Sequence, residues 1–409
     1  MVLWRSFMAA IAARKKSKIE NQGFLRQLPL LDFTATLYPD IDLSDVYVIC
    51  AQHLVSTTYS LFHTLLKLGL KAGNLSTIGK CYSTDPMAYE EIKKMGIDAC
   101  PSSLSFNSHQ PFDEQYRENI KKFVSERTKK LTDGKFKKLI VLDDGGELIP
   151  AINALLEEGS HIVGIEQTSS GFHKLKTKKT KFPIVNVARS PAKLNYESPI
   201  IARLVVDTLV RHIKNLPVHP REVLIIGNGP IGSQIREVLK DTYHLSIFDK
   251  TASRSSIKSE DFEQSLKKFD LIIGCTGKSV LRPEHYRLLK KNVILVSASS
   301  SDREFNAVNL RNKMPLVTDC HENLFIGGIC LINCGFPINF SSEFKIIDSD
   351  ELQLTRSLLL AAILQADNHS NFTKKDFIAL DIENQRDIIQ KYLSIFAKDK
   401  LVEREKLAV

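Results

Sequence analysis

The stretch VLIIGNGPIGSQIREVL, residues 223–239, sets a short glycine-rich turn between an apolar run and a helical pattern. The turn comprises Gly227, Gly229, Pro230, Ile231 and Gly232. Glycines at this spacing allow a tight turn and let a pyrophosphate approach the backbone at the N-terminus of the following helix. Because strand, spacing and helix occur together, the segment predicts a dinucleotide-binding Rossmann unit.

An acidic residue stands at the end of the next apolar run. That run is LSIF, residues 245–248, and Asp249 follows it. A carboxylate there accepts hydrogen bonds from an adenosine ribose and repels a 2′-phosphate, so the sequence predicts NAD rather than NADP. The alternative interpretation is a glycine turn with an unrelated surface aspartate.

Short apolar runs alternate with helical patterns along most of the chain. In the first half they occupy residues 46–51, 138–142, 161–165 and 183–187. In the second half they occupy residues 223–227, 245–249, 270–277 and 292–299. This alternation is typical of parallel sheets with helices on both faces. The predicted fold class is therefore α/β, with two doubly wound Rossmann-like units joined near residues 200–218.

The chain from about Asn333 onward is predicted to be helical. The segment SDELQLTRSLLLAAILQA, residues 349–366, is the clearest pattern, and no third sheet is expected. A lone helical tail must bury its apolar residues on a folded unit, so we expect it to pack back on the first one. The opening residues 1–16 are also predicted to form a helix. Their apolar run is interrupted by Arg5 and is too short to cross a membrane.

Composition and charge argue against several classes of function. The chain has 409 residues and a formal net charge of +9, but its lysines and arginines are spread along the sequence, which argues against a nucleic-acid partner. The seven cysteines are scattered without metal-ligand spacing, so no metal site is predicted. A reducing, cytoplasmic setting fits this cysteine pattern best, and no membrane partner is expected.

Polar residues after the apolar runs of the first unit are candidates for a binding site. They are His53, Asp143, Asp144, Glu166 to Ser170, and Lys193. In an open parallel sheet, ligands bind beyond the carboxyl ends of the strands, so these side chains are expected at one rim. Taken singly, each has a structural explanation, such as a helix cap for Asp144 or simple exposure for Lys193.

Three segments around these residues resemble S-adenosylhomocysteine hydrolases in order and spacing. They are VLDDGGELI (141–149), GIEQTSSGFHKL (164–175) and FPIVNVARSPAKLNYESP (182–199), followed by the glycine motif. The resemblance runs from about residue 45 to about 366. It implies an NAD-binding Rossmann domain, residues 201–339, inserted into a substrate and catalytic domain formed by residues 1–200 and 340–409. It also implies a nucleoside-like substrate and a homo-oligomer.

The resemblance implies a specific use of NAD. The cofactor oxidises the ribose 3′-hydroxyl of the substrate, a thiol is eliminated, water adds, and the hydride returns. The catalytic positions of the family match Lys193, Asp144 and His53, and Glu197 stands where the family has an aspartate. Its cofactor positions match Thr168, Ser169, Ser170, Thr276 and Asn333, in addition to the glycine turn.

Several substrate positions of the family are changed in this chain. Gln167 replaces a glutamate that pairs with the ribose hydroxyls, and Thr57 replaces a glutamate that helps to select adenine. Two histidines are missing, with Ser300 at one position and Asn339 or Phe340 at the other. The predicted function is thus 3′-oxidising chemistry with altered specificity or reduced hydrolase activity. The alternatives are a catalytically inactive NAD-binding relative that acts through protein partners, and a simple dehydrogenase of small acids.

Overall fold

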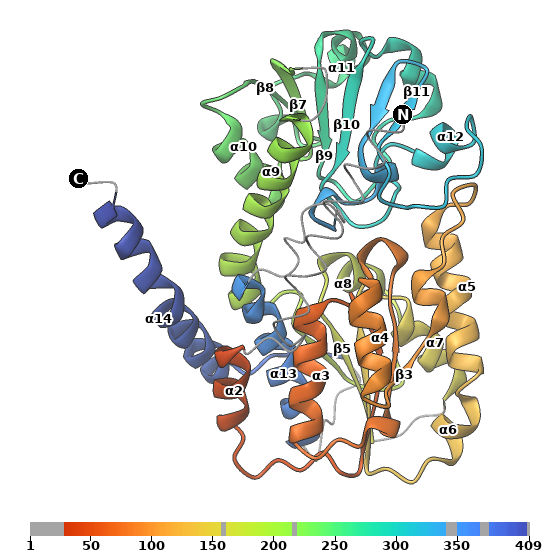
Figure 1. The fold of residues 1–409 in the computed structure, drawn as a ribbon, viewed down its shortest axis with the longest axis vertical. Coiled ribbons are helices and arrows are strands. Elements are labelled where there is room, and N and C mark those ends of the chain that lie inside the picture. Colours follow the sequence, from red (N-terminus) through yellow and green to blue (C-terminus); the bar gives the residue numbers. More distant parts are fainter. Residues whose placement is uncertain (1–27, 157–160, 215–218, 341–349, 369–375, 407–409) are drawn as a thin grey trace, which may run out of the picture.

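The computed structural model describes residues 28–156, 161–214, 219–340, 350–368 and 376–406, which form two α/β domains stacked end to end (Figure 1). The N-terminal helix predicted for residues 1–16 lies outside these residues. No helix within the described ranges is both long and apolar enough to span a membrane. All seven cysteines are described, and each is a free thiol.

The first domain is built on a seven-stranded sheet in the order β13-β6-β5-β4-β1-β2-β3. Every strand pair in it is parallel. The strands are β1 Val46–Ala51, β2 Leu75–Ile78, β3 Asp98–Ala99, β4 Lys138–Asp143, β5 Ile162–Glu166, β6 Ile184–Asn186 and β13 Phe377–Ala379. All residues of β1 and β4 are buried, because helices cover both faces of the sheet, and this explains the unbroken apolar runs at residues 46–51 and 139–142.

Helices of the first domain come from both ends of the chain. They are α2 Pro29–Thr36, α3 Ser56–Lys67, α4 Pro86–Lys94, α5 Phe112–Ser125, α6 Thr128–Asp133, α7 Leu148–Leu155, α8 Ser169–Leu175, α13 Gln353–Asn368 and α14 Ile382–Lys406. Helix α13 is buried on nearly all sides and contacts α2, α3 and α14. The prediction that the helical tail packs on the first unit is therefore confirmed.

The tail differs from the prediction in one respect. It contributes β13, which pairs in parallel with β6 at the edge of the first sheet. A strand of three residues has too little periodicity to be recognised in a sequence, so a purely helical tail was the wrong expectation here. Strands β2 and β3 of this sheet were missed for the same reason.

The second domain contains a six-stranded sheet in the order β11-β12-β10-β9-β7-β8, parallel except for the β11–β12 pair. Its strands are β7 Glu222–Ile226, β8 His244–Phe248, β9 Leu271–Gly274, β10 Val293–Ser297, β11 Leu324–Ile326 and β12 Ile329–Leu331. Its helices are α10 Pro230–Leu239, α11 Phe262–Ser265 and α12 Ala307–Arg311. The predicted α/β class with two doubly wound sheets is thus confirmed.

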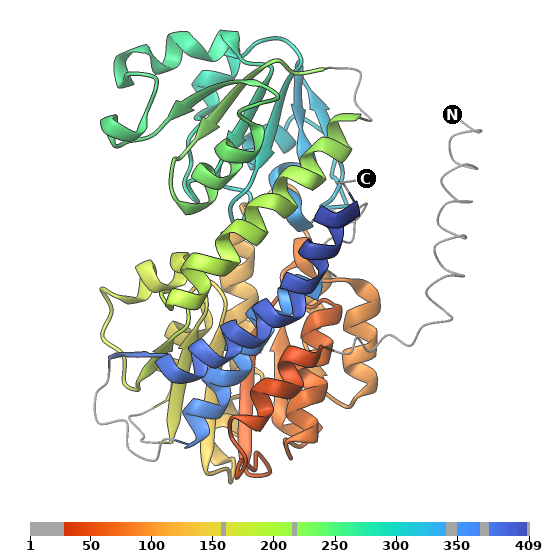
Figure 2. The same ribbon diagram turned by 90° about the vertical axis from the view of Figure 1, so that its left-hand side faces the viewer.

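The two domains are linked by the long helix α9, Ser198–Lys214, which rises from the first domain to the second (Figure 2). They also touch through a buried ion pair in the second domain, where Arg311 Nη2 lies 2.5 Å from Asp302 Oδ2. Arg311 Nε donates to the carbonyl of Ser108, and the Phe112 amide donates to Asp302, so this pair binds backbone of the first domain. These contacts hold the second domain against the first.

Candidate functional site

A cavity of about 150 Å³ lies at the carboxyl ends of the first-domain strands, facing the second domain. The predicted residues that line it are His53, Asp144, Gln167, Thr168, Lys193, Glu197, Asn339 and Phe340. The first six of these meet because parallel strands β1, β4, β5 and β6 end at the same edge of the sheet, and Asn339 and Phe340 reach it on the segment that leaves the second domain. The polar residues that follow separate strands thus share one site.

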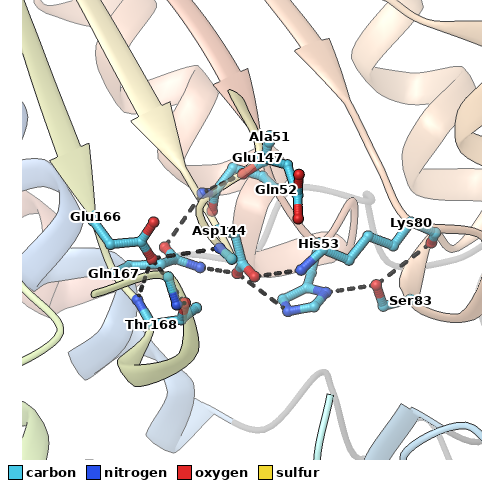
Figure 3. A network of polar contacts seen from close by, with 12 residues as sticks. Ala51, Gln52, His53, Lys80, Ser83, Asp144, Glu147, Glu166, Gln167 and Thr168 are labelled. Atoms are coloured by element: carbon cyan, nitrogen blue, oxygen red, sulfur yellow. Dashed lines mark hydrogen bonds and ion pairs between the residues drawn. The ribbon is translucent and has the colours of Figure 1, made fainter. Parts of the chain in front are cut away.

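Asp144 is the centre of a buried polar network (Figure 3). Its Oδ1 lies 2.5 Å from Lys80 Nζ, and its Oδ2 lies 3.3 Å from His53 Nε2 and accepts from Gln167 Nε2. Burial alone would raise the pKa of Asp144, but the Lys80 ammonium and these hydrogen bonds hold it well below its usual range. Asp144 is therefore ionised, and both of its oxygens already have partners.

Lys80 is a site residue that the sequence analysis missed. It lies just beyond β2 and is only 5% exposed. Burial opposes its charge, yet Asp144 more than compensates, so the pKa of Lys80 lies above its usual range. Its position just after the strand LSTI was the available signal, but that strand is four residues long and was not recognised.

His53 contacts both Asp144 and Phe340, which lies on the segment that leaves the second domain. Its Nδ1 lies 2.5 Å from Ser83 Oγ, and its ring packs on Phe340 with a centroid separation of 4.5 Å. Burial lowers the pKa of His53 to about 3, despite the opposing charge of Asp144. We therefore assign a neutral imidazole whose Nε2–H donates to Asp144 and whose Nδ1 accepts from Ser83.

His53 should make folding stability sensitive to acid. Because its folded pKa of about 3 lies below the unfolded value of 6.5, the unfolded chain binds the extra proton, and stability is lost as pH falls below 6.5. Between pH 6.5 and 5 the native protein should lose about 1.6 kcal/mol more than His53→Asn does. Urea unfolding at both pH values measures this difference. The exposed His109 gives the control His109→Asn, which should keep the native pH dependence, whereas equal slopes for native protein and His53→Asn would contradict the assignment.

Lys193 and Glu197 form the second charged pair of the cavity. Both lie on a single π-helical turn, Lys193–Glu197, directly before α9, and Lys193 Nζ is 2.5 Å from Glu197 Oε2. Turns of this kind are frequent at functional sites. The turn places an ammonium and a carboxylate side by side, with the side chains 17% and 11% exposed.

Two further carboxyl groups are buried at the ends of the strands that carry the site. Asp143 and Glu166 are register partners on β4 and β5, and both are fully buried. Glu166 Oε1 accepts from the backbone N–H and the hydroxyl of Thr168, and Asp143 Oδ2 accepts from the Ile149 amide of α7. Burial raises the pKa of Asp143 to about 6 and that of Glu166 well above its usual range. These groups fix the loops that present Asp144 and Thr168.

The glycine turn of the second domain has the geometry that a dinucleotide requires. Gly227 has a φ of +101°, and a Cβ on Gly232 would lie 1.9 Å from the Gly227 carbonyl oxygen, so neither position accepts a side chain without strain. Gly229 precedes α10 and has open space around it, with Pro230 and Ile231 opening the helix. The turn therefore fits a pyrophosphate at a helix N-terminus.

Asp249 and Thr276 flank this turn. Asp249 accepts from the backbone amides of Asn228 and Thr251. Burial opposes its charge, but these hydrogen bonds hold the pKa of Asp249 below its usual range. Thr276 and its neighbouring loop are held by the buried Glu304, which the sequence analysis missed and which accepts from the Thr276 amide at 2.6 Å.

The remaining predicted cofactor residues are dispersed. Asn333 is fully buried and has a φ of +54°. Its side-chain Nδ2 donates to the Pro337 carbonyl oxygen, so Asn333 shapes the loop that leads to Phe340. Ser170 and Ser300 line a smaller crevice of about 30 Å³ that shares Asp144 with the main cavity. Ser169 is exposed at the start of α8 and lines neither space.

Comparisons with known proteins identify the relatives of this chain. A family model described as “Putative NAD(P)-binding” matches residues 215–309, so the second domain is an NAD(P)-binding domain. The “Uncharacterized protein Rv0104” of Mycobacterium tuberculosis is 36% identical over 363 residues, covering 87% of this chain and 71% of that protein.

Two more distant relatives carry names that describe an activity. The “S-inosyl-L-homocysteine hydrolase” of Methanococcus maripaludis is 26% identical over 67% of this chain and 65% of its own length. The “Adenosylhomocysteinase” of Thermococcus kodakarensis is 22% identical over 66% of this chain and 65% of its own length. The chain therefore belongs to the same family as the Mycobacterium tuberculosis protein Rv0104, has an NAD(P)-binding second domain, and is distantly homologous to these two hydrolases.

Proposed function

We propose that the protein binds NAD and acts on a nucleoside-like thioether, with 3′-oxidising chemistry of the S-adenosylhomocysteine hydrolase type and an altered specificity or reduced rate. The observation that supports it is the convergence of His53, Asp144, Lys193 and Glu197 on one cavity. That cavity is lined on one side by Asn339 and Phe340, where the chain leaves the NAD(P)-binding domain. This chemistry needs a site that excludes water, and a cavity beside a second domain can be shielded when the domains close on a ligand.

Lys193 and Glu197 are assigned the proton transfers at the substrate sugar. A hydroxyl group placed between them accepts a hydrogen bond from the ammonium and can give its proton to the carboxylate. NAD bound at the glycine turn would supply the hydride acceptor for that sugar carbon. Asp249 favours NAD over NADP, because a 2′-phosphate beside its carboxylate would be repelled.

Asp144 is assigned a different role from the one that the sequence predicts. Both of its oxygens are engaged by Lys80, His53 and Gln167, and its low pKa makes it a weak base. We therefore assign Asp144 as a fixed negative charge that orients His53 at the cavity and holds Lys80 in place. The free cysteines favour a reducing compartment such as the cytoplasm, and the family resemblance leads us to propose a homo-oligomer.

The decisive experiment follows the redox state of the bound cofactor. Purified, NAD-loaded protein is mixed with S-adenosylhomocysteine, S-inosyl-L-homocysteine, adenosine and inosine, and NADH absorbance is recorded. We expect reduction with at least one of these compounds, because the sugar hydroxyl is oxidised before the later steps. No reduction with any of them would contradict the proposal.

One observation favours a second candidate function, that of a catalytically inactive regulatory relative. The side-chain amide of Gln167 donates a hydrogen bond to the Asp144 carboxylate. The two groups that would face a ribose hydroxyl therefore already bind one another. A protein of this kind would carry NAD that no nucleoside reduces and would co-purify with a protein partner. Mass spectrometry of the gently purified protein distinguishes the two functions by the ligands and partners it carries.

A further inference from the structure

One wall of the cavity carries a cation that was absent from the sequence analysis. Arg356 lies on α13, one helical turn after Leu352, and both line the cavity. The arginine is 4% exposed. Its Nε donates to Thr57 Oγ1 at 3.1 Å and its Nη1 donates to Gln52 Oε1 at 3.3 Å, and both of these acceptors are neutral.

The guanidinium has no carboxylate partner within ion-pair distance among the described residues. The other lysine that lines the cavity is neutralised, since Lys193 pairs with Glu197, and Lys80, which lines the neighbouring crevice, pairs with Asp144. Burial lowers the pKa of Arg356 to about 10, so it stays charged at neutral pH. A buried charge is stable only when it is paired or hydrogen-bonded, and a ligand oxygen would supply the missing acceptor for Nη2.

A second polar group on the same wall also lacks a partner. Thr355 Oγ1 is buried and makes no hydrogen bond within the described part of the chain. The apolar side chains of Ile201, Leu204 and Leu352 complete this side of the cavity. The apolar side chains and the guanidinium together suit a flat, apolar ring whose edge carries a strong acceptor.

We propose that Arg356 selects the base of the nucleoside by donating from Nη2 to a ring carbonyl oxygen, so that the substrates are 6-oxopurine nucleosides and their thioethers rather than the adenine counterparts. This inference rests on the proposed function, because it places a nucleoside in the cavity. A 6-oxopurine carries a carbonyl acceptor where adenine carries an amino donor. An amino group at that place would set donor against donor and leave the guanidinium unsatisfied.

The test is calorimetric titration of the NAD-loaded full chain with inosine and with adenosine. We expect inosine to bind about 10- to 100-fold more tightly, as a hydrogen bond to a charged group provides. In Arg356→Met this preference should disappear, through weaker binding of inosine. In the control Arg386→Met, which removes an exposed arginine of α14, the preference should remain.

Each outcome decides a separate point. Equal binding of the two nucleosides to the native protein overturns the role of Arg356 alone. A preference that survives in Arg356→Met also overturns it. Binding of neither nucleoside to protein that carries NAD overturns the proposed function together with this inference. If Arg356→Met fails to fold, Arg356→Lys keeps the charge but loses the planar donor geometry, and an unchanged preference in that variant counts against the proposal.

Discussion

Replacing Lys193 with alanine is expected to slow nucleoside-dependent reduction of bound NAD by about 10²- to 10⁴-fold, the usual effect of removing one acid–base group. Lys193 Nζ lies in the cavity with Glu197 as its ion-pair partner, so no other described lysine replaces it there. Cofactor binding should be unchanged, because the glycine turn belongs to the other domain. Rapid-mixing absorbance measures the rate, and gel filtration with cofactor assay measures retained NAD.

The chain offers a matched control for this variant. Lys122 pairs with Glu126 at the same spacing of four residues, but on the exposed surface of α5. Lys122→Ala removes a similar ion pair and should leave the rate unchanged. A Lys193→Ala protein that keeps the native rate would show that the lysine has no catalytic role, and one that loses NAD as well would indicate a structural role.

Lys80→Met should destabilise the protein by about 3–5 kcal/mol, because it leaves the Asp144 carboxylate buried without its ammonium partner. The side chains are 6% and 3% exposed, so water does not replace the lost charge. The remaining contacts to His53 and Gln167 offset only part of this cost. Chemical unfolding of the native protein and the variant at neutral pH measures the loss.

A second substitution tests the reason for that loss. In the double variant Lys80→Met with Asp144→Asn, the buried charge is gone, so much of the stability should return. The exposed pair of Lys94 with Glu91 supplies the control, and Lys94→Met should cost about 0.5 kcal/mol or less. A double variant that is no more stable than Lys80→Met would refute electrostatic coupling between the two residues.

The role of Asp144 shows how partners alter the chemistry of a residue. Its sequence context, VLDDGGE, predicts a carboxylate at the mouth of a strand, and that placement is correct. Its three partners then lower its basicity and fix its position. The sequence could not reveal this, because Lys80 and Gln167 lie 64 and 23 residues away along the chain.

Local sequence patterns predicted the long central strands of both sheets, the glycine turn and the strand ends that carry the candidate site. These features depend on local patterns, since a strand buried on both faces must be apolar throughout and a turn that approaches a phosphate must contain glycine. Which charged side chains meet depends instead on how distant segments of the chain pack. Arg356 reaches Thr57 across 299 residues, and β13 joins β6 from the far end of the chain. Such contacts cannot be predicted from hydrophobic periodicity, because they depend on how whole helices and strands pack and not on neighbouring residues in the sequence.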